Sequence, residues 1–131
     1  MAKAEGRTVS FVGPEAIDTS ALETFPYQGP DQEIVTTTGE FSAVCPFSGL
    51  PDIAELSLRY VPLDCCIELK SLKYYMMSYR NVGIFQEHAT ARFAQDLQQV
   101  LHAKTLTVTT RYNVRGGFET TCSVALPGTV E

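Results

Sequence analysis

The segment "AVCPFSGLPD", residues 43–52, joins two stretches of alternating residues and predicts a stiff turn between them. Its two prolines fix their own φ angles and push the residues before them toward extended geometry. Gly49 permits a chain reversal that a Cβ would hinder. Such a turn can hold the Cys45 thiol and the Asp52 carboxyl at a constant separation. An ordinary connection with a buried cysteine and a turn aspartate has the same pattern, so the residues alone leave both interpretations open.

The alternation on either side of this turn predicts two strands. Upstream, the chain alternates from Glu33 toward Cys45. Downstream, residues 54–62 read "AELSLRYVP" and end at a proline. The residues expected to share one face of the second strand are Leu56, Leu58 and Tyr60.

Two later segments, 68–81 and 86–102, have apolar residues at helical spacing. In the first, "ELKSLKYYMMSYRN", the apolar positions are Leu69, Leu72, Met76 and Tyr79, which leaves Lys70, Ser71 and Lys73 elsewhere on the helix surface. In the second, "QEHATARFAQDLQQVLH", the apolar stripe is Phe93, Ala94, Leu97, Val100 and Leu101. The sequence therefore predicts two consecutive amphipathic helices.

The tail "LTVTTRYNVRGGFETTCSVAL", residues 106–126, predicts two more strands around an Arg-Gly-Gly turn. The order strand, strand, helix, helix, strand, strand predicts an α+β domain over residues 32–131. We expect an antiparallel four-stranded sheet with both helices on one face. The other sheet face and both edges need partners, so we expect neighbouring copies to join their sheets into a barrel-shaped ring.

Residues 1–31 hold three of the seven prolines. They predict an N-terminal arm without regular structure that packs on a neighbour.

The composition excludes several classes of protein. A net charge of −5 argues against binding to a nucleic-acid backbone. No apolar run is long enough to span a membrane, and the first ten residues lack the apolar core of a signal peptide. We therefore expect a cytoplasmic protein with reduced cysteines. Four cysteines without a CxxC pair, together with two histidines, predict no metal site.

Five short motifs carry a resemblance to a known family: "CPFSGLPD", "ELKSLKYY", "SYRN", "FQEH" and "RGGF". Together they resemble the short, single-module 7-cyano-7-deazaguanine reductases, a family of the tunnelling-fold superfamily that includes GTP cyclohydrolase I. The resemblance runs from about residue 33 to residue 125. It implies a tunnelling fold assembled as a homo-oligomer of stacked rings, such as a decamer. The implied reaction is NADPH-dependent reduction of a deazapurine nitrile in queuosine biosynthesis, a tRNA-modification pathway.

The chemistry of a nitrile suits a thiol and a carboxyl at the two ends of this turn. A nitrile carbon is a weak electrophile toward hydride, and a thiolate is a good nucleophile for it. Cys45 would form a covalent thioimide, and Asp52 would protonate the nitrile nitrogen. Asp52 must then keep its proton near neutral pH, which requires partial burial and a raised pKa.

The resemblance also implies binding residues. For the substrate these are Ile67, Glu68, Leu69, Gln86 and Glu87, with Glu87 accepting hydrogen bonds from the deazaguanine. For NADPH they are Lys70, Ser71, Lys73, Arg115 and Gly116. Taken alone, Glu87 also fits a helix-dipole acid, and the lysines fit a solvated helix face. Since no GxGxxG follows a strand, we expect the cofactor to bind across a subunit boundary.

Three positions depart from the pattern of many relatives. Ser48 and Leu50 stand where threonine and glutamine are common, and Gln86 stands where a histidine precedes the anchoring glutamate. We assign His88 no catalytic role.

Two other functions stay open from the sequence. One is an amidinotransferase-like relative that uses the same Cys and Asp with ammonia or glutamine. The other is a pterin- or purine-binding module without turnover. Lys70 and Lys73 favour the reductase over the first, and Cys45 with Asp52 favours catalysis over the second.

Overall fold

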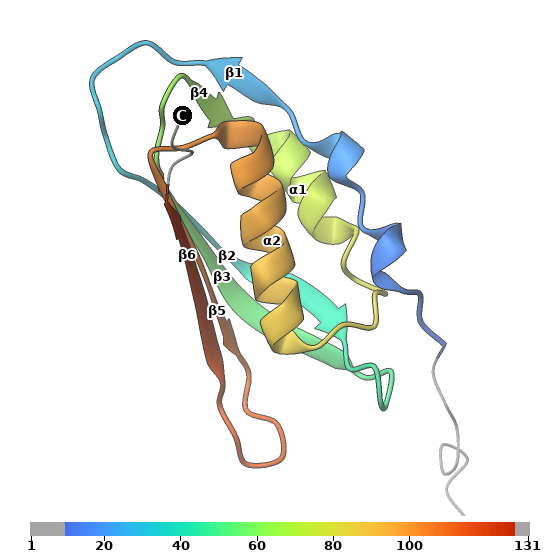
Figure 1. The fold of residues 1–131 in the computed structure, drawn as a ribbon. Coiled ribbons are helices and arrows are strands. Elements are labelled where there is room, and N and C mark those ends of the chain that lie inside the picture. The colour runs from blue at the N-terminus through green and yellow to red at the C-terminus, as the bar shows by residue number, and fades with distance from the viewer. Residues whose placement is uncertain (1–9, 128–131) are drawn as a thin grey trace, which may run out of the picture.

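The computed structural model describes residues 10–127 as a layer of helices on an antiparallel sheet (Figure 1). The sheet contains four strands in the order β2-β3-β5-β6. Their bounds are β2 Ile34–Val44, β3 Pro51–Val61, β5 Thr105–Tyr112 and β6 Thr121–Pro127. Helices α1 (Leu69–Met77) and α2 (Gln86–Leu101) lie on the same face of this sheet. The predicted order of strands and helices and the predicted one-sided helix layer are confirmed.

The alternation of buried and exposed residues along the strands explains which face of the sheet packs against the helices. The predicted inward residues of β3 are buried, and β5 alternates in the same way. Above them, a cluster of aromatic rings fills the space between the sheet and both helices with edge-on contacts. These rings belong to Phe41, Tyr75, Tyr79 and Phe93. The core therefore lies between the sheet and the helices.

Helix α2 follows its predicted stripe closely. Phe93, Ala94, Leu97 and Leu101 are buried, whereas Val100 is only partly buried. The helix ends at Leu101. The next residue, His102, caps it with a left-handed φ of 46°, and the His102 N–H donates to the Gln98 carbonyl. The predicted end at residue 102 is thus correct to one residue.

The buried face of helix α1 differs from the predicted one. Leu69 is 58 % exposed, while Tyr75, which the predicted stripe omitted, is fully buried. The helix also ends at Met77, four residues before the predicted end. Packing of Tyr75 against α2 decides which face of α1 is buried, because the Tyr75 hydroxyl donates to Asp96 at 2.7 Å.

The prediction that Ser71 lies on the surface is wrong. Its side chain is buried beneath the N-terminal segment, where its hydroxyl accepts from the Glu23 N–H at 3.0 Å. The same hydroxyl donates to the Glu68 carbonyl at 2.6 Å. A hydroxyl with local and long-range partners can be buried without an unpaired donor.

The prediction of an irregular arm is wrong for residues 10–31. This segment forms two single-turn 3-10 helices, Pro14–Ala16 and Thr19–Ala21, and strand β1 (Thr24–Pro26). Strand β1 pairs antiparallel with β4 (Cys65–Ile67), a short strand that the sequence analysis missed. The segment therefore packs on its own chain. Residues 1–9, the rest of the predicted arm, lie outside the described residues.

No helix of residues 10–127 is long and apolar enough to cross a membrane.

Candidate active site

Cys45 lies at the start of a tight loop that connects β2 to β3. Its N–H donates to the Leu50 carbonyl at 2.9 Å, and its carbonyl accepts from the Gly49 N–H at 2.8 Å. Gly49 has a φ of 71°, a conformation that a side chain would strain. The stiff turn and the role of its glycine are therefore confirmed. The Cys45 side chain is buried, with 8 % exposure.

Asp52 belongs to β3 and not to the loop, which corrects its predicted position in a turn. It is the second residue of the strand and pairs with Ala43 of β2. Both residues are buried, so the Asp52 carboxyl lies on the helix-covered face of the sheet, with 6 % exposure. Cys45 follows Ala43 by two residues, which keeps the thiol and the carboxyl at the same end of the same hairpin.

The environment shifts the two pKa values in opposite directions. Hydrogen bonding from the Ser48 backbone lowers the pKa of the Cys45 thiol and outweighs the opposing effect of burial. Weaker contributions from Phe47, the Ser48 hydroxyl and the Arg115 charge also lower it. Burial raises the pKa of the Asp52 carboxyl, although the Arg115 guanidinium partly opposes this rise. The Cys45 thiol is therefore easier to ionise than an ordinary thiol, and the Asp52 carboxyl at the same end of the hairpin is harder to ionise than an ordinary carboxyl.

The start of α2 lies beside this loop. The Val44 N–H donates to the Val82 carbonyl at 2.9 Å, and the Ile84 N–H donates to the Val44 carbonyl at 3.1 Å. This parallel contact brings the first turn of α2, with Gln86 half-buried and Glu87 exposed, to the Cys45 end of the sheet.

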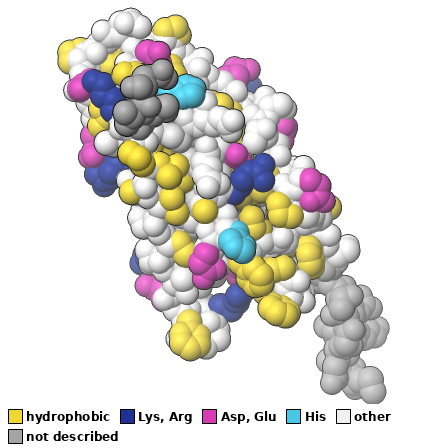
Figure 2. Space-filling model, viewed as in Figure 1, with side chains coloured by type: hydrophobic (Ala, Val, Ile, Leu, Met, Phe, Trp, Pro, Cys, Tyr) yellow, Lys and Arg dark blue, Asp and Glu magenta, His cyan; other side chains and the backbone are white. Residues whose placement is uncertain are grey.

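Exposed apolar side chains gather at this end of the molecule (Figure 2). Phe47 of the loop is 88 % exposed, and its ring lies 6.1 Å from that of Phe85. Phe118, in the β5–β6 turn, is also exposed. A flat aromatic ligand could therefore stack near the buried Cys–Asp pair.

The remaining predicted residues lie around the start of α1. Glu68 caps this helix, because its carboxylate accepts from the Lys70 and Ser71 N–H groups at 3.1 and 2.7 Å. Ile67 is buried, and its N–H donates to the Tyr60 hydroxyl at 3.1 Å. Ile67, Glu68 and Leu69 line a cavity of about 520 Å³ together with β1 and β2 side chains.

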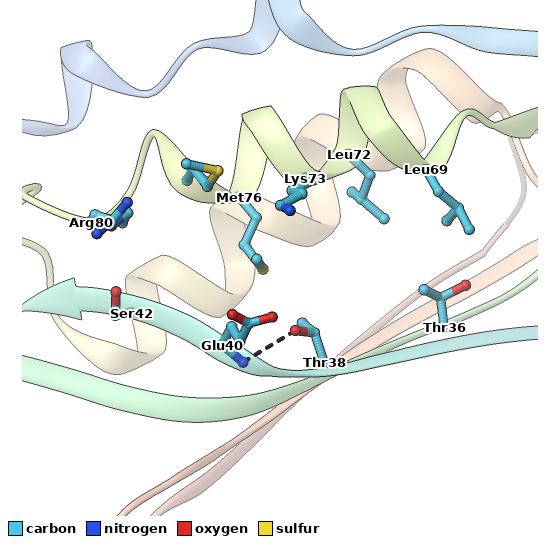
Figure 3. Close-up of a pocket in the computed structure, with 10 residues that line it drawn as sticks. Thr36, Thr38, Glu40, Ser42, Leu69, Leu72, Lys73, Met76 and Arg80 are labelled. Atoms are coloured by element: carbon cyan, nitrogen blue, oxygen red, sulfur yellow. Dashed lines mark hydrogen bonds between the residues drawn. The ribbon is translucent and has the colours of Figure 1, made fainter.

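A second hollow, of about 490 Å³, runs between α1 and β2 (Figure 3). The helix contributes Leu69, Leu72, Lys73 and Met76. The strand contributes Thr36, Thr38, Glu40 and Ser42. Arg80, just beyond the helix, also lines the hollow, whereas Lys70 does not. The sequence analysis missed Arg80 and Glu40, although the "SYRN" motif and the alternation of β2 pointed to them.

The structure therefore divides the predicted site residues into two groups. The first group lies at the Cys45 end of the sheet and contains Cys45, Asp52, Gln86, Glu87, Arg115 and Gly116. The second lies at the start of α1 and contains Ile67, Glu68, Leu69, Lys70, Ser71 and Lys73. Thr36 lies beside the second group and precedes Cys45 by nine positions, which corresponds to about 30 Å of extended chain. The start of α1 and the Cys45 loop accordingly lie at opposite ends of the fold (Figure 1).

The fold and this end of the sheet define a small α+β protein with a buried cysteine and a buried aspartate at one end of a hairpin. A family model described as "QueF-like protein" matches residues 51–128. A Thermotoga maritima protein named NADPH-dependent 7-cyano-7-deazaguanine reductase is 52 % identical over 122 residues, 92 % of this chain and 89 % of the relative. A Caldicellulosiruptor bescii protein of the same name is 48 % identical over 120 residues, 90 % of this chain and 92 % of the relative. The chain belongs to the QueF-like protein family, and the resemblance in its motifs is confirmed.

A solved structure supports the fold. It is described as "Crystal structure of the archaeosine synthase QueF-Like in the apo form". It matches with a TM-score of 0.66 and 22 % identity, covering 79 % of this chain and 100 % of that one.

Proposed function

We propose that this chain is an oxidoreductase that uses NADPH to reduce the nitrile of 7-cyano-7-deazaguanine to 7-aminomethyl-7-deazaguanine in queuosine biosynthesis. One observation carries the proposal: the buried Cys45 and Asp52 lie at one end of the β2–β3 hairpin with pKa values shifted in opposite directions. The names of the relatives supply the substrate and the cofactor.

The first step joins Cys45 to the substrate. The Cys45 thiolate sulfur forms a bond to the nitrile carbon, one π bond of the C≡N group breaks, and the nitrogen takes the proton of Asp52. The lowered pKa of the thiol favours the nucleophile, and the raised pKa of the carboxyl favours the acid. The product is a neutral thioimide on Cys45 and a carboxylate at Asp52.

When bound, NADPH supplies the two hydrides that, with two protons, convert the nitrile carbon to an aminomethyl carbon. Cys45 leaves as a thiolate between the two transfers. We assign the return of protons to the nitrogen to Asp52 as well, since its buried carboxyl lies at the same end of the β2–β3 hairpin as the sulfur that holds the substrate.

Several cations of this chain fit a phosphate-bearing cofactor. Lys73 and Arg80 line the hollow beside α1, and Lys70 is exposed on the first turn of the same helix. The apolar wall of Leu72 and Met76 fits the uncharged parts of a dinucleotide. We therefore keep the two lysines as cofactor residues and add Arg80 to them.

The two groups of site residues meet only if copies of the chain assemble. Within one chain, Cys45 and the cavity beside Glu68 lie about 30 Å apart along β2, too far for one deazaguanine. In the described part of the chain, β2 pairs only with β3, and β6 pairs only with β5, so each leaves an edge for a neighbour. We propose that copies join these edges into the ring of a tunnelling fold and that each site combines residues of two neighbours.

Incubation of the protein with the nitrile and NADPH, followed by nicotinamide absorbance, tests this function. Oxidation of two NADPH per nitrile consumed is the expected result. Incorporation of ammonia or glutamine nitrogen without NADPH oxidation would instead identify the amidinotransferase alternative and contradict the proposal.

A further inference from the structure

Arg115, which the motif comparison assigns to the cofactor, contacts the acid in this structure. Its Nη1 donates to Oδ1 of Asp52, and among residues 10–127 no other side chain hydrogen-bonds to that carboxyl. The carboxyl is buried, whereas the arginine side chain is 51 % exposed. The guanidinium therefore reaches from the surface to a buried group.

The backbone of the β5–β6 turn holds Arg115 in this place. Arg115 and Phe118 exchange two backbone hydrogen bonds, at 2.9 and 3.0 Å. Gly116 and Gly117 make the turn possible with φ angles of 60° and 85°. The Asn113 N–H donates to the Ile53 carbonyl at 2.9 Å, which fixes the start of the turn beside Asp52.

The contact leaves one carboxyl oxygen for the reaction. A neutral carboxyl accepts with its carbonyl oxygen and donates with its hydroxyl. Because Arg115 donates to Oδ1, the proton belongs on Oδ2. We propose, on the basis of the proposed function, that Arg115 is a positioning residue of the covalent step, which it orients through Asp52 before any cofactor binds.

The negative charge that develops on Asp52 during the covalent step supports the same role for Arg115. As the Cys45 sulfur bonds to the nitrile carbon, the Asp52 Oδ2–H bond breaks and the nitrogen takes the proton, so negative charge develops on Asp52. A guanidinium already in place stabilises that charge without reorganisation. The same positive charge contributes to lowering the pKa of Cys45.

The other ionisable groups at this end are few. Cys45 comes from the loop after β2. Glu87 and His88 in the first turn of α2, and Glu119 in the β5–β6 connection, are exposed. Tyr112 of β5 is buried without a hydrogen-bond partner for its hydroxyl, and burial raises its pKa far above neutral pH. Among residues 10–127, Arg115 is the only cation that contacts the Asp52 carboxyl, and its charge acts on both Asp52 and Cys45.

Arg115→Ala tests the inference through the rate of adduct formation on Cys45 without NADPH, measured by intact-protein mass spectrometry from pH 5 to pH 9. Since Arg115 lowers the pKa of both groups, its removal moves the whole bell-shaped profile to higher pH. We expect a loss of about tenfold or more at pH 7, smaller than the roughly 10²–10⁴-fold effect of removing a general acid. Arg115→Lys, which keeps the charge, should return the profile toward the wild-type position.

Arg59→Ala is the matched control. It also removes an arginine from an ion pair with a carboxylate, at 2.6 Å from Glu33, but about 23 Å further along β3. Its adduct profile should match that of the wild type. An unchanged pH profile of adduct formation in Arg115→Ala, with only a raised KM for NADPH, overturns the inference. Arg115 would then be a cofactor-binding residue only. Absence of any adduct in the wild type overturns the proposed function itself.

Discussion

Replacement of Asp52 by Asn separates the chemical role of this carboxyl from its effect on stability. The amide keeps an oxygen that accepts from Arg115 but has no proton to give to the nitrile nitrogen. We expect turnover to fall by roughly 10²–10⁴-fold, the usual contribution of a general acid. Substrate binding should change little, because the side chain keeps its size and its contact.

The same variant should be more stable than the wild type at neutral pH. Burial raises the pKa of Asp52 in the folded chain above its ordinary value, despite the opposing effect of Arg115. In the unfolded chain Asp52 is ionised at neutral pH, so folding must either protonate it or bury its charge. The stability that this group contributes is fully present below its unfolded pKa and is lost as the pH rises through its folded pKa. The neutral amide of the Asp52→Asn variant does not titrate, so the variant suffers no such loss.

Turnover by nicotinamide absorbance and Tm at pH 5 and pH 8 together test this prediction. The gain in Tm of Asp52→Asn over the wild type should be larger at pH 8 than at pH 5. Asp31→Asn serves as control, since it removes a carboxylate from an exposed ion pair with Lys104 at 2.8 Å, and it should change neither quantity much. Wild-type turnover in Asp52→Asn, or a Tm gain only at pH 5, would refute the reasoning.

Three further predictions concern binding and assembly. Glu87→Ala should weaken binding of the deazaguanine by about 1–3 kcal/mol through lost charge-assisted hydrogen bonds, measured by calorimetry in a Cys45→Ala background; an unchanged Kd would remove Glu87 from the site. Lys70→Ala and Lys73→Ala should each weaken NADPH binding by about 1.5–3 kcal/mol per lost phosphate contact, which raises the KM for NADPH, and should leave adduct formation without NADPH unchanged. If sites combine two copies, co-assembly of Cys45→Ala with Lys73→Ala should restore up to about a quarter of the activity, whereas sites within one chain would restore none.

The parts of the fold that follow a simple period could be predicted from the sequence. Alternation in β3 and the stripe in α2 each bury one face against a single neighbouring layer, so local pattern and tertiary packing agree. Leu69 and Tyr75 of α1 show where that agreement ends. Both fit an amphipathic helix, and only the partner Asp96 on α2 decides which of them is buried.

The N-terminal segment shows a second limit. Its prolines correctly exclude long helices, but they do not reveal that Glu23 meets Ser71, forty-eight residues away. Short strands such as β1 and β4, each of three residues, also carry too little pattern to be predicted.

The residues of the candidate site could be predicted from the sequence, but their arrangement in space could not. Cys45 and Asp52 could be named from their motif, and the structure places them at one end of one hairpin. The contact between Arg115 and Asp52 joins residues sixty-three apart and depends on the register of β3 with β5. The separation of Cys45 from the Glu68 cavity likewise appears only when the strands are assembled.

The mass of the intact protein after incubation with 7-cyano-7-deazaguanine, without NADPH, tests the central claim most directly. We predict one added substrate mass per chain in the wild type, loss of the adduct on addition of NADPH, and no adduct in Cys45→Ala. Cys122→Ala, which removes a half-buried thiol from β6, should still form it. An unmodified wild-type mass, or an adduct that persists in Cys45→Ala, would contradict the covalent mechanism.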